Sequence, residues 1–391
     1  MNANPLADER PGPLQGVVVA DLSRILAGPY CTMLLADMGA TVIKIESPDG
    51  DDTRRFAPPV HEDVATYFQS ANRNKRSLVL DFAQADDLAT AKAVIARADV
   101  VVENFKAGGL RRFGLDYESL APDRPELVYA SITGFGTGDG AHLAGYDLMV
   151  QALSGFMDTT GAQHGEPFRG GFALFDVLTG LHTALGILAA LRHRERSGTG
   201  QLVETNLLSA ALSSMVNQTQ AFAAAGVVPR RMGNQHPSLY PYEPFPTADL
   251  PLVIAVGNDA QFARLCVAVG RSDLVLDPRF AAPALRNEHR DALRPEIVAA
   301  LADRGAAEWF DLLTSVGVPS APIQTIEDGI RFAERIGLEP IALAGRTLPI
   351  VRNPLTFSQT PVDYPIAPPA LGEGGQELLD RMSAPAKKRN P

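Results

Sequence analysis

Residues 17–46, VVVADLSRILAGPYCTMLLADMGATVIKIE, decide the fold. The β-branched run at 17–22 predicts a strand, the segment around PYCTMLLADMG predicts a helix, and TVIKIE at 41–46 predicts a second strand. Together they form a βαβ unit with parallel strands. Gly28 and Pro29 suit a helix start, because proline favours the first turn and a bare glycine lets a ligand approach the backbone. The G-x-G-x-x-G dinucleotide fingerprint is absent.

The same alternation continues beyond this unit. Strand-like runs follow at 77–82, 99–105 and 127–135, and a helical pattern at 83–98 lies between the first two. This order predicts an α/β fold with a mostly parallel sheet flanked by helices. In open sheets of this kind, ligands bind beyond the carboxyl ends of the strands, so we expect the site in the turns after them.

The rest of the chain predicts a second, smaller domain. A long apolar helix at 176–195 is stopped by Gly198 and Gly200, and a strand start then runs into a second long helix. A stretch at 226–248, rich in Pro and Tyr, indicates a linker, after which a strand and several helical segments predict a compact domain. The proline-rich tail after residue 330 is expected to run extended across a surface.

The composition is that of a globular chain. Its 391 residues are 46% hydrophobic, which allows a sizeable core and two domains. The net charge of -10 opposes binding to a phosphate backbone, so we expect no nucleic-acid partner. The two cysteines, Cys31 and Cys266, lie in apolar stretches, which favours a reducing, cytoplasmic location over a disulfide framework.

We expect neither a signal peptide nor a membrane partner. Residues 1–16 contain acidic residues and prolines without an apolar centre. Residues 171–191 are long enough to span a bilayer, but Asp176 and His182 interrupt them. We therefore expect this segment to be a buried helix of a soluble protein.

Two basic clusters are predicted near strand ends. The first is NRNKR at 72–76, and the second is ENFKAGGLRRFG at 103–114, with Lys106, Arg111 and Arg112. Cationic side chains suit a phosphorylated ligand such as a nucleotide, and glycine leaves neighbouring backbone N–H groups accessible to it. A solvated surface run explains either cluster equally well.

Asp176 is the carboxylate in the most apolar surroundings, between GGFALF and VLTGLHTALGILAAL. Its simplest role is to cap the helix that follows by accepting a backbone N–H from the first turn. A desolvated carboxylate is also a candidate nucleophile with a perturbed pKa, and Gly170 and Gly171 would let a substrate come close. The residues alone leave both interpretations open.

Other polar residues give weaker signals. Tyr146 and Asp147 precede a helical apolar pattern, and Asp147 is expected to cap that helix. His236 lies in a loop and is expected to be solvated. No His, Cys and carboxylate set has metal-ligand spacing and no G-x-S-x-G elbow occurs, so we expect neither a metal site nor a serine esterase.

In their order along the chain, these segments resemble the class III CoA-transferase family, also called the carnitine dehydratase/bile-acid-inducible protein group. The similarity runs from about residue 13 to 376 and covers nearly the whole chain. It is carried by ADLSRILAGPYCTMLLADMGATVIKIESPDGDDTR, ANRNKRSLVLDF, ADVVVENFKAGGLRRFGLDYESL, GYDLMVQALSG, FALFDVLTG, GILAALRHRERSGTGQ, GNQHPSLYPYEPFPTAD and PPALGE.

The resemblance implies a homodimer of two subunits that interlock like rings. Each subunit would contain a Rossmann-like large domain with a mostly parallel sheet and a smaller α/β domain. On this basis we expect the large, CoA-binding domain at 1–205 and 330–391, a linker helix at 206–229 and the small domain at 230–329.

The resemblance also implies a covalent mechanism. The aspartate matching Asp176 would attack a donor acyl-CoA to give a mixed anhydride and then an aspartyl-CoA thioester, from which a carboxylic acid acceptor takes the CoA. Covalent catalysis conserves thioester energy only if water is kept out, and the apolar flanks of Asp176 serve this purpose. Coenzyme A would be substrate and product, with no permanently bound cofactor.

Site residues are carried over by position. CoA contacts are expected near Leu26, Ala27, Asn72, Lys75, Arg76, Asn104, Phe105, Lys106, Arg112 and Phe113. The substrate pocket is expected around 135–147, the segment before Asp176 and 233–243, with Tyr146, Asp147, Gly170, Gly171, His236 and Tyr240 as its contacts and Tyr242 as a further wall.

Two departures bear on the substrate. Formyl-CoA transferases have glutamine where Leu26 stands and a glycine-rich loop where GNQHPSLYPY stands, which disfavours oxalate and formyl-CoA. Racemases of 2-methylacyl-CoA place a proton-shuttling histidine where Tyr146 stands, and tyrosine is a poor replacement for that base. Succinyl-CoA or another small dicarboxyl-CoA is the expected donor. A racemase and a non-catalytic CoA-binding protein remain the alternatives.

Overall fold

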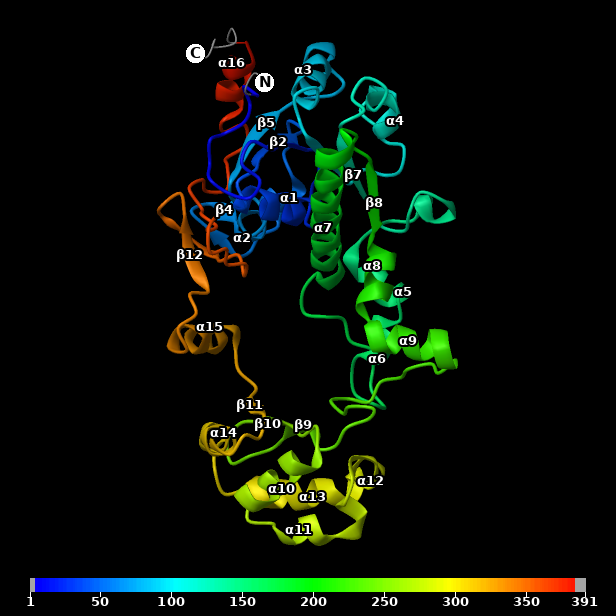
Figure 1. Ribbon diagram of the computed structural model, residues 1–391, viewed down its shortest axis with the longest axis vertical. Helices are drawn as coiled ribbons and strands as arrows, with labels where there is room; N and C mark the ends of the chain where they lie inside the picture. The colour runs from blue at the N-terminus through cyan, green and yellow to red at the C-terminus, as the bar shows by residue number, and fades with distance from the viewer. Residues whose placement is uncertain (1–3, 384–391) are drawn as a thin grey trace. The chain divides into compact units, whose positions relative to one another are not determined.

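The structure is a computed structural model that describes residues 4–383 (Figure 1). The chain divides into two compact units. Unit 1 comprises Met1–Phe156, Arg169–Val227 and Glu339–Pro391. Unit 2 comprises Met157–Phe168 and Val228–Leu338.

Unit 1 is built on a six-stranded sheet in which all neighbouring strands are parallel. The order β5-β2-β1-β6-β7-β8 is that of a doubly wound sheet, with a switch point between β1 and β6. This confirms the expected α/β class and parallel sheet. The strands are β1 (Val18–Asp21), β2 (Thr41–Glu46), β5 (Lys75–Val79), β6 (Val100–Glu103), β7 (Val128–Thr133) and β8 (Leu202–Asn206).

Each face of this sheet carries its own hydrophobic core. Successive strand residues point to opposite faces, so Val100 and Val102 lie in one core and Val101 lies in the other. The first core is closed by α1 (Ala27–Asp37) and α7 (Leu174–Ser197), and the second by α3 (Ala85–Ile95). Because both faces are covered, the strands read as continuous apolar runs.

The strands lie close to their expected positions except β5. It begins at Lys75, two residues before the apolar run at 77–82. Lys75 pairs with Val42 in the parallel ladder, and its side chain is fully buried. A buried charge at the start of a strand gives no hydrophobic signal, which explains why the sequence places this strand too late.

Helices α1 and α7 lie side by side on the first face (Figure 1). Glycine is required at position 28 for packing within the protein, because a Cβ there would lie 2.2 Å from the Cβ of Ser23. Helix α7 begins two residues before its expected start and ends as predicted, with Gly198 in the left-handed region at φ 76°.

By length and composition alone, α7 could cross a membrane, a property that it shares with core helices of soluble proteins. It packs against α1, β7, β8 and α8 (Leu207–Ser214), and 44% of its most apolar window is buried. Leu181 and Leu185 on its outer face are 43% and 66% exposed. The expected second long helix is split into α8 and α9 (Val216–Ala225), with a positive φ at Val216 between them.

The end of the chain returns to unit 1. Ser77 of β5 forms a parallel bridge with Gly374, and α16 (Gly375–Ser383) packs beside that strand (Figure 1). The other strands and α-helices that lie wholly in this unit are short: β3 (Val60–His61), β4 (Val64–Ala65), α2 (Thr66–Gln69), α4 (Tyr117–Leu120), α5 (Asp147–Leu153), β12 (Ile341–Ala344) and β13 (Leu348–Val351).

Unit 2 has its own core around an antiparallel sheet in the order β11-β10-β9. Trp309 lies in this core. The strands are β9 (Tyr242–Phe245), β10 (Leu252–Ala255) and β11 (Ser320–Pro322). The α-helices are α10 (Asp259–Ala268), α11 (Asp273–Leu276), α12 (Pro283–Glu288), α13 (Arg290–Leu301), α14 (Ala306–Ser315) and α15 (Ile326–Arg335), together with most of α6 (Phe156–Thr159).

Candidate active site

A cavity of about 310 Å³ lies in unit 1 at the carboxyl edge of the parallel sheet. It is lined by residues 24–27 after β1, residues 104–107 after β6 and parts of 132–146 after β7, together with Asp52 and Asp176. Strands β1 and β6 are the neighbours between which the strand order switches. The cavity therefore occupies the position at which doubly wound folds bind their ligands.

Asp176 enters this cavity from the first turn of α7. The helix begins at Leu174 and its N-cap residue is Ala173, so the expectation that Asp176 caps the helix is wrong. Within residues 4–383, no group donates a hydrogen bond to its carboxylate, and the neighbouring charge that acts on it is Asp147. The Asp176 oxygens thus remain free to react.

Asp147, at the first position of α5, performs the capping instead. Its Oδ1 atom accepts hydrogen bonds from the backbone N–H groups of Phe175 and Asp176, at 2.7 and 3.1 Å. The expectation that Asp147 caps its own helix is therefore wrong as well, because its side chain reaches across to α7. Gln151, one turn later, donates to Asp147 and accepts from the N–H of Gly170, which ties the segment before α7 to α5.

Burial raises the pKa of Asp176 to about 7, and the negative charge of Asp147 adds to the rise. Both effects disfavour the ionised carboxylate. Protonated and ionised forms of Asp176 are therefore both populated near neutral pH. An ionised carboxylate of raised pKa is more basic than an ordinary one and hence a stronger nucleophile.

The position of Asp176 depends on close packing between α7 and α1. A Cβ on Gly180, one turn after Asp176, would lie only 2.6 Å from the backbone oxygen of Ala27. Glycine is therefore required at this crossing. It brings the start of α7 against the start of α1, so that Asp176 and Ala27 line the same cavity.

A second close approach shapes the part of the wall that follows β7. A Cβ on Gly134 would lie 2.3 Å from the Cα of Gly145, so the loop after β7 folds back on itself. This fold brings Tyr146 to the cavity wall, with 68% of its surface exposed. The expected pocket loop at 135–147 thus contributes to the cavity.

The expected CoA contacts separate into two groups. Leu26, Ala27, Asn104, Phe105 and Lys106 line the cavity. The other five are not among its lining residues: Asn72, Lys75, Arg76, Arg112 and Phe113.

The NRNKR segment is neither a solvated run nor a free cationic cluster. The Nζ atom of Lys75 bonds to Asp21 at 3.1 Å and to Asn72 at 3.0 Å, and all three side chains are buried. Burial lowers the pKa of Lys75 to about 8, against the opposing effect of Asp21. Arg76 pairs with Asp8. These side chains are engaged inside unit 1 and do not face the cavity, which the charge pattern did not indicate.

Arg112 and Phe113 lie on the helical turn that follows the cavity loop. The guanidinium of Arg112 lies 4.5 Å from the centre of the Phe113 ring, and that ring packs edge to face on Phe82 at 5.5 Å. Arg112, Phe113 and Phe82 thus form a cluster of one cation and two aromatic rings.

The remaining expected contacts lie elsewhere. Gly171 is exposed with open space around it, and neither it nor Gly170 lines the cavity. His236 belongs to unit 2, where its Nδ1 accepts from the N–H groups of Ser238 and Leu239 and is thus engaged locally. Tyr240 is buried at 2% exposure in the core of unit 2, whereas Tyr242 is 38% exposed.

Arg24 and Asp52 also line the cavity, although neither was expected as a site residue. The Arg24 guanidinium lies 3.5 Å from the Asp52 carboxylate, and both side chains are largely open to solvent. The sequence could have indicated Arg24 only by its position, because Arg24 lies in the turn after the first strand. Within residues 4–383, no group of three or more His, Cys, Asp or Glu side chains is placed to hold a metal ion.

Several known proteins are similar to this chain over most of its length. The chain is 42% identical over 403 residues to the succinate–glutarate CoA-transferase of Agrobacterium fabrum, covering 98% of each chain. It is 41% identical over 384 residues to the succinyl-CoA:mesaconate CoA-transferase of Haloarcula hispanica, covering 94% of this chain and 96% of that one. It is 39% identical to mouse succinyl-CoA:glutarate CoA-transferase over 318 residues, covering 81% and 73%.

Solved structures show the same fold. A CAIB/BAIF family protein from Brucella suis superimposes with a TM-score of 0.87 at 39% sequence identity, over 96% of this chain and 100% of that chain. The family model described as CoA-transferase family III matches residues 14–374. The chain therefore belongs to the CoA-transferase family III.

Proposed function

We propose that this CoA-transferase moves CoA from succinyl-CoA to a small dicarboxylic acid through a covalent intermediate on Asp176. The observation that carries the proposal is the Asp176 carboxylate itself. It lines the cavity at the switch point of the sheet, accepts no hydrogen bond from residues 4–383, and has a pKa raised to about 7 by burial. These are the properties of a nucleophile rather than of a structural carboxylate.

The first half of the reaction loads CoA onto the enzyme. An Asp176 oxygen attacks the thioester carbon of succinyl-CoA and expels CoA thiolate, which leaves a succinyl–aspartyl anhydride. The thiolate then attacks the aspartyl carbon of this anhydride and releases succinate. The product is an aspartyl-CoA thioester, so the thioester bond energy is retained on the protein.

The second half repeats these steps in reverse with a new acid. The acceptor carboxylate attacks the aspartyl thioester carbon and displaces CoA thiolate, and a mixed anhydride forms again. The thiolate attacks the acceptor acyl carbon, which yields the new acyl-CoA and restores the Asp176 carboxylate. No proton, electron or further reactant is consumed in the cycle.

Two observations support dicarboxylic substrates. Three relatives at 39 to 42% identity bear names of transferases for succinate with glutarate or mesaconate. The cavity also contains two cationic side chains, Arg24 and Lys106, which suit anionic substrates. Arg24 has only a loose contact with Asp52, so its guanidinium is available to a carboxylate.

Trapping the intermediate tests the mechanism. The protein is incubated with succinyl-CoA and hydroxylamine, which converts an aspartyl anhydride or thioester to a hydroxamate, and peptide mass spectrometry locates the modified residue. We expect modification at Asp176 and none in Asp176→Asn. Asp52→Asn is the matched control, because Asp52 is the other carboxylate of the cavity wall, and this variant should still be modified at Asp176. Modification at another residue would contradict the mechanism.

A substrate panel tests the acid pair. Several acyl-CoA donors are combined with mono- and dicarboxylic acids, and the new thioesters are separated by chromatography. We expect turnover with succinyl-CoA and dicarboxylic acids of four or five carbons. Equal turnover with monocarboxylic acids of the same length would contradict the proposed substrate class.

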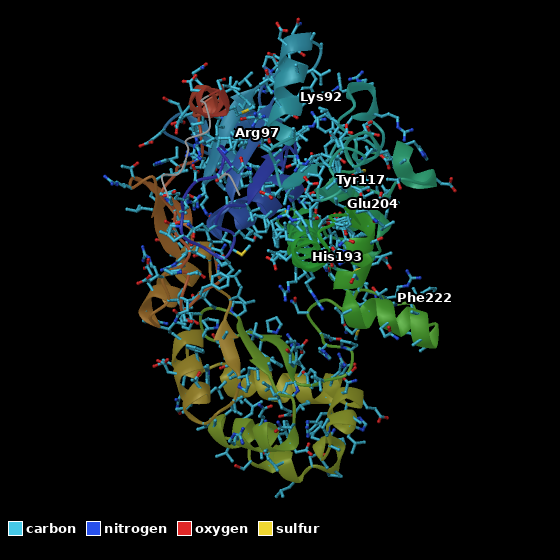
Figure 2. All side chains as sticks on the ribbon, turned by 45° about the horizontal axis from the view of Figure 1, so that its top comes forward. Lys92, Arg97, Tyr117, His193, Glu204 and Phe222 are labelled. Carbon is cyan, nitrogen blue, oxygen red and sulfur yellow. The ribbon has the colours of Figure 1, made fainter. Side chains whose placement is uncertain are left out.

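We further propose that the enzyme is a homodimer of interlocked subunits. The resemblance to the family led to this expectation, and exposed apolar side chains on three helices of unit 1, together called the apolar face, support it. The outer sides of α5, α7 and α9 expose large side chains, including Phe222 of α9 (Figure 2). The exposed fractions are Leu153 63%, Leu185 66%, Val216 68% and Phe222 60%.

Sedimentation velocity tests the dimer. Leu185→Glu places a charge on the apolar face and should shift the protein towards the monomer. Leu276→Glu is the control, because Leu276 is 85% exposed on α11 and belongs to unit 2 rather than to this face of unit 1. A monomeric wild type, or equal effects of the two variants, would contradict the proposed interface.

A further inference from the structure

The turn between β1 and α1 contains a strained residue in the cavity wall. Ile25 has φ 69°, in the left-handed region that a β-branched side chain rarely adopts. The strain is relieved if the peptide group joining Arg24 and Ile25 flips, because such a flip returns φ of Ile25 to negative values. Something in the protein must therefore hold this peptide group in place.

Side chains from two distant segments hold it at both ends. The carbonyl oxygen of Arg24 accepts a hydrogen bond from Nδ2 of Asn104 at 2.6 Å. The N–H of Ile25 donates to both carboxylate oxygens of Asp51, at 3.3 and 3.2 Å. A flip would break all of these bonds at once, and it would leave a buried carboxylate with one donor fewer.

The preceding peptide group is held in the same way. The N–H of Arg24 donates to Oδ1 of Asn104 at 2.9 Å, and the carbonyl oxygen of Ser23 accepts from Nζ of Lys44 at 2.8 Å. Lys44 also bonds to Asp51 at 2.8 Å, and both side chains are buried. Burial by itself raises the pKa of Asp51, but Lys44 holds it below its ordinary value, so Asp51 is ionised at neutral pH.

Asn104 thus has a structural use in addition to the expected CoA contact. Its Oδ1 and Nδ2 atoms are both engaged with Arg24, although the residue also lines the cavity. The segment that it fixes continues into Leu26 and Ala27, which form the wall shared with Asp176. A shift of this wall would move a bound thioester relative to the Asp176 carboxylate.

We propose that Asn104 and Asp51 are positioning residues of the transfer reaction, which hold the Arg24–Ile25 peptide group unflipped and thereby fix the cavity wall beside Asp176. The inference rests on the role proposed above for Asp176. A misplacement of about 1 Å at a reacting centre is enough to lower the rate by about 100-fold. We therefore expect Asn104→Ala to lower kcat by about this factor.

A double-mutant cycle with Ile25 tests the proposal. Glycine adopts positive φ without strain, so in Ile25→Gly no backbone strain favours the flip. The hydrogen bonds of Asn104 and Asp51 to this peptide group, which together form the clamp, then become dispensable. We expect Asn104→Ala to lower kcat less than about 10-fold in this background. Ile25→Ala is the matched control, because alanine keeps a Cβ and hence the strain, and Asn104→Ala should there act as in the wild type.

Asn104 is partly exposed, so its variant is expected to fold, whereas Asp51→Asn leaves buried Lys44 without its charged partner. The loss of kcat in Asp51→Asn is therefore a second test, used only if the thermal unfolding midpoint of this variant matches that of the wild type. Equal losses of kcat on adding Asn104→Ala to the wild type, to Ile25→Gly and to Ile25→Ala would overturn the proposal. A rise in KM for the CoA thioester with unchanged kcat would also overturn it and restore Asn104 as a ligand contact.

Hydrogen exchange separates this inference from the proposed mechanism. The Ile25 amide is held by buried Asp51, and we expect its exchange rate to rise at least 10-fold in Asn104→Ala but not in Asp52→Asn. Exchange needs no turnover. If hydroxylamine trapping fails at Asp176 while exchange of the Ile25 amide rises in Asn104→Ala, the covalent mechanism is contradicted and the clamp is not. If the exchange rate of the Ile25 amide is unchanged in Asn104→Ala, the clamp is contradicted.

Discussion

Asp176→Asn should destroy transfer and at the same time stabilise the protein. The folded state raises the pKa of Asp176 to about 7, against an ordinary value of 3.8, so folding disfavours its ionised form. A carboxyl group with a raised pKa contributes stability while it is protonated. This contribution is complete below pH 3.8 and is lost as the pH rises to about 7. Above that pH, the wild type carries the full cost of a buried charge.

The size of the effect follows from the shift. A pKa difference of roughly three units corresponds to about 4 kcal/mol, which is an upper bound because the Asp176 side chain is only partly buried and lines a cavity. We expect Asn, which has the same shape and no charge, to raise the free energy of unfolding at pH 8 by about 2–4 kcal/mol. Between pH 8 and pH 5 the advantage of the variant should shrink by about 2–3 kcal/mol, because the wild type becomes protonated.

Urea unfolding at pH 8 and pH 5 measures this difference. Far-UV circular dichroism follows the whole chain, whereas fluorescence of the single tryptophan, Trp309, follows the core of unit 2. Asp176 belongs to unit 1, so a gain seen only in fluorescence would have another origin. Asp52→Asn, at a more exposed carboxylate of the same cavity, should change stability little at either pH.

An equal stability difference between Asp176→Asn and the wild type at both pH values would refute the raised pKa of Asp176. Such a result would mean that the carboxyl group titrates in the folded protein as it does in the unfolded chain. A variant that is less stable at pH 8 would show that the Asp176 carboxylate has a stabilising partner.

Three further predictions follow from the same site. The kcat/KM of the wild type should rise with pH through about 7, as Asp176 ionises, and Asp147→Asn should move this rise to lower pH, because the charge of Asp147 raises the pKa of Asp176; pH–rate profiles of both proteins test this. Gly180→Val should lower stability by about 1–3 kcal/mol and reduce transfer, since a Cβ at 180 would lie 2.6 Å from the oxygen of Ala27; thermal unfolding and transfer assays with Gly171→Val as control test this. Lys106→Gln should raise KM for the acyl-CoA several-fold and weaken its dependence on salt, because Lys106 contributes a positive charge to the cavity, and an unchanged salt dependence would exclude an electrostatic role.

Much of the sheet could be predicted from local pattern. The runs at 17–22 and 41–46 are β-branched and lie close to β1 and β2, because a buried parallel strand needs a continuous apolar run. The topological rule for such sheets also gave the right place for the cavity, in the turns after the strands. It could not indicate that Arg24 belongs to this wall, since the rule names a turn and not a side chain.

The site could be predicted only in part, because the roles of its carboxylates depend on contacts between segments. From the sequence, Asp147 and Asp176 both read as caps of their own helices. In the structure, Asp147 caps the helix of Asp176, and the Asp176 carboxylate has no donor among residues 4–383. The direction of the Asp176 pKa shift was undecidable from the sequence, since a helix start lowers it and burial raises it.

The sequence by itself determined the alternation of strands and helices, the class of fold and the choice of Asp176 as the residue to examine, because period, β-branching and apolar flanks are properties of neighbouring residues. The tertiary structure alone decided that Lys75 is buried, that Gly180 allows α7 to pack closely against Ala27, and that Asn104 holds a strained turn. Burial, charge and hydrogen bonding act through space between segments far apart in the chain, so no local pattern can record them.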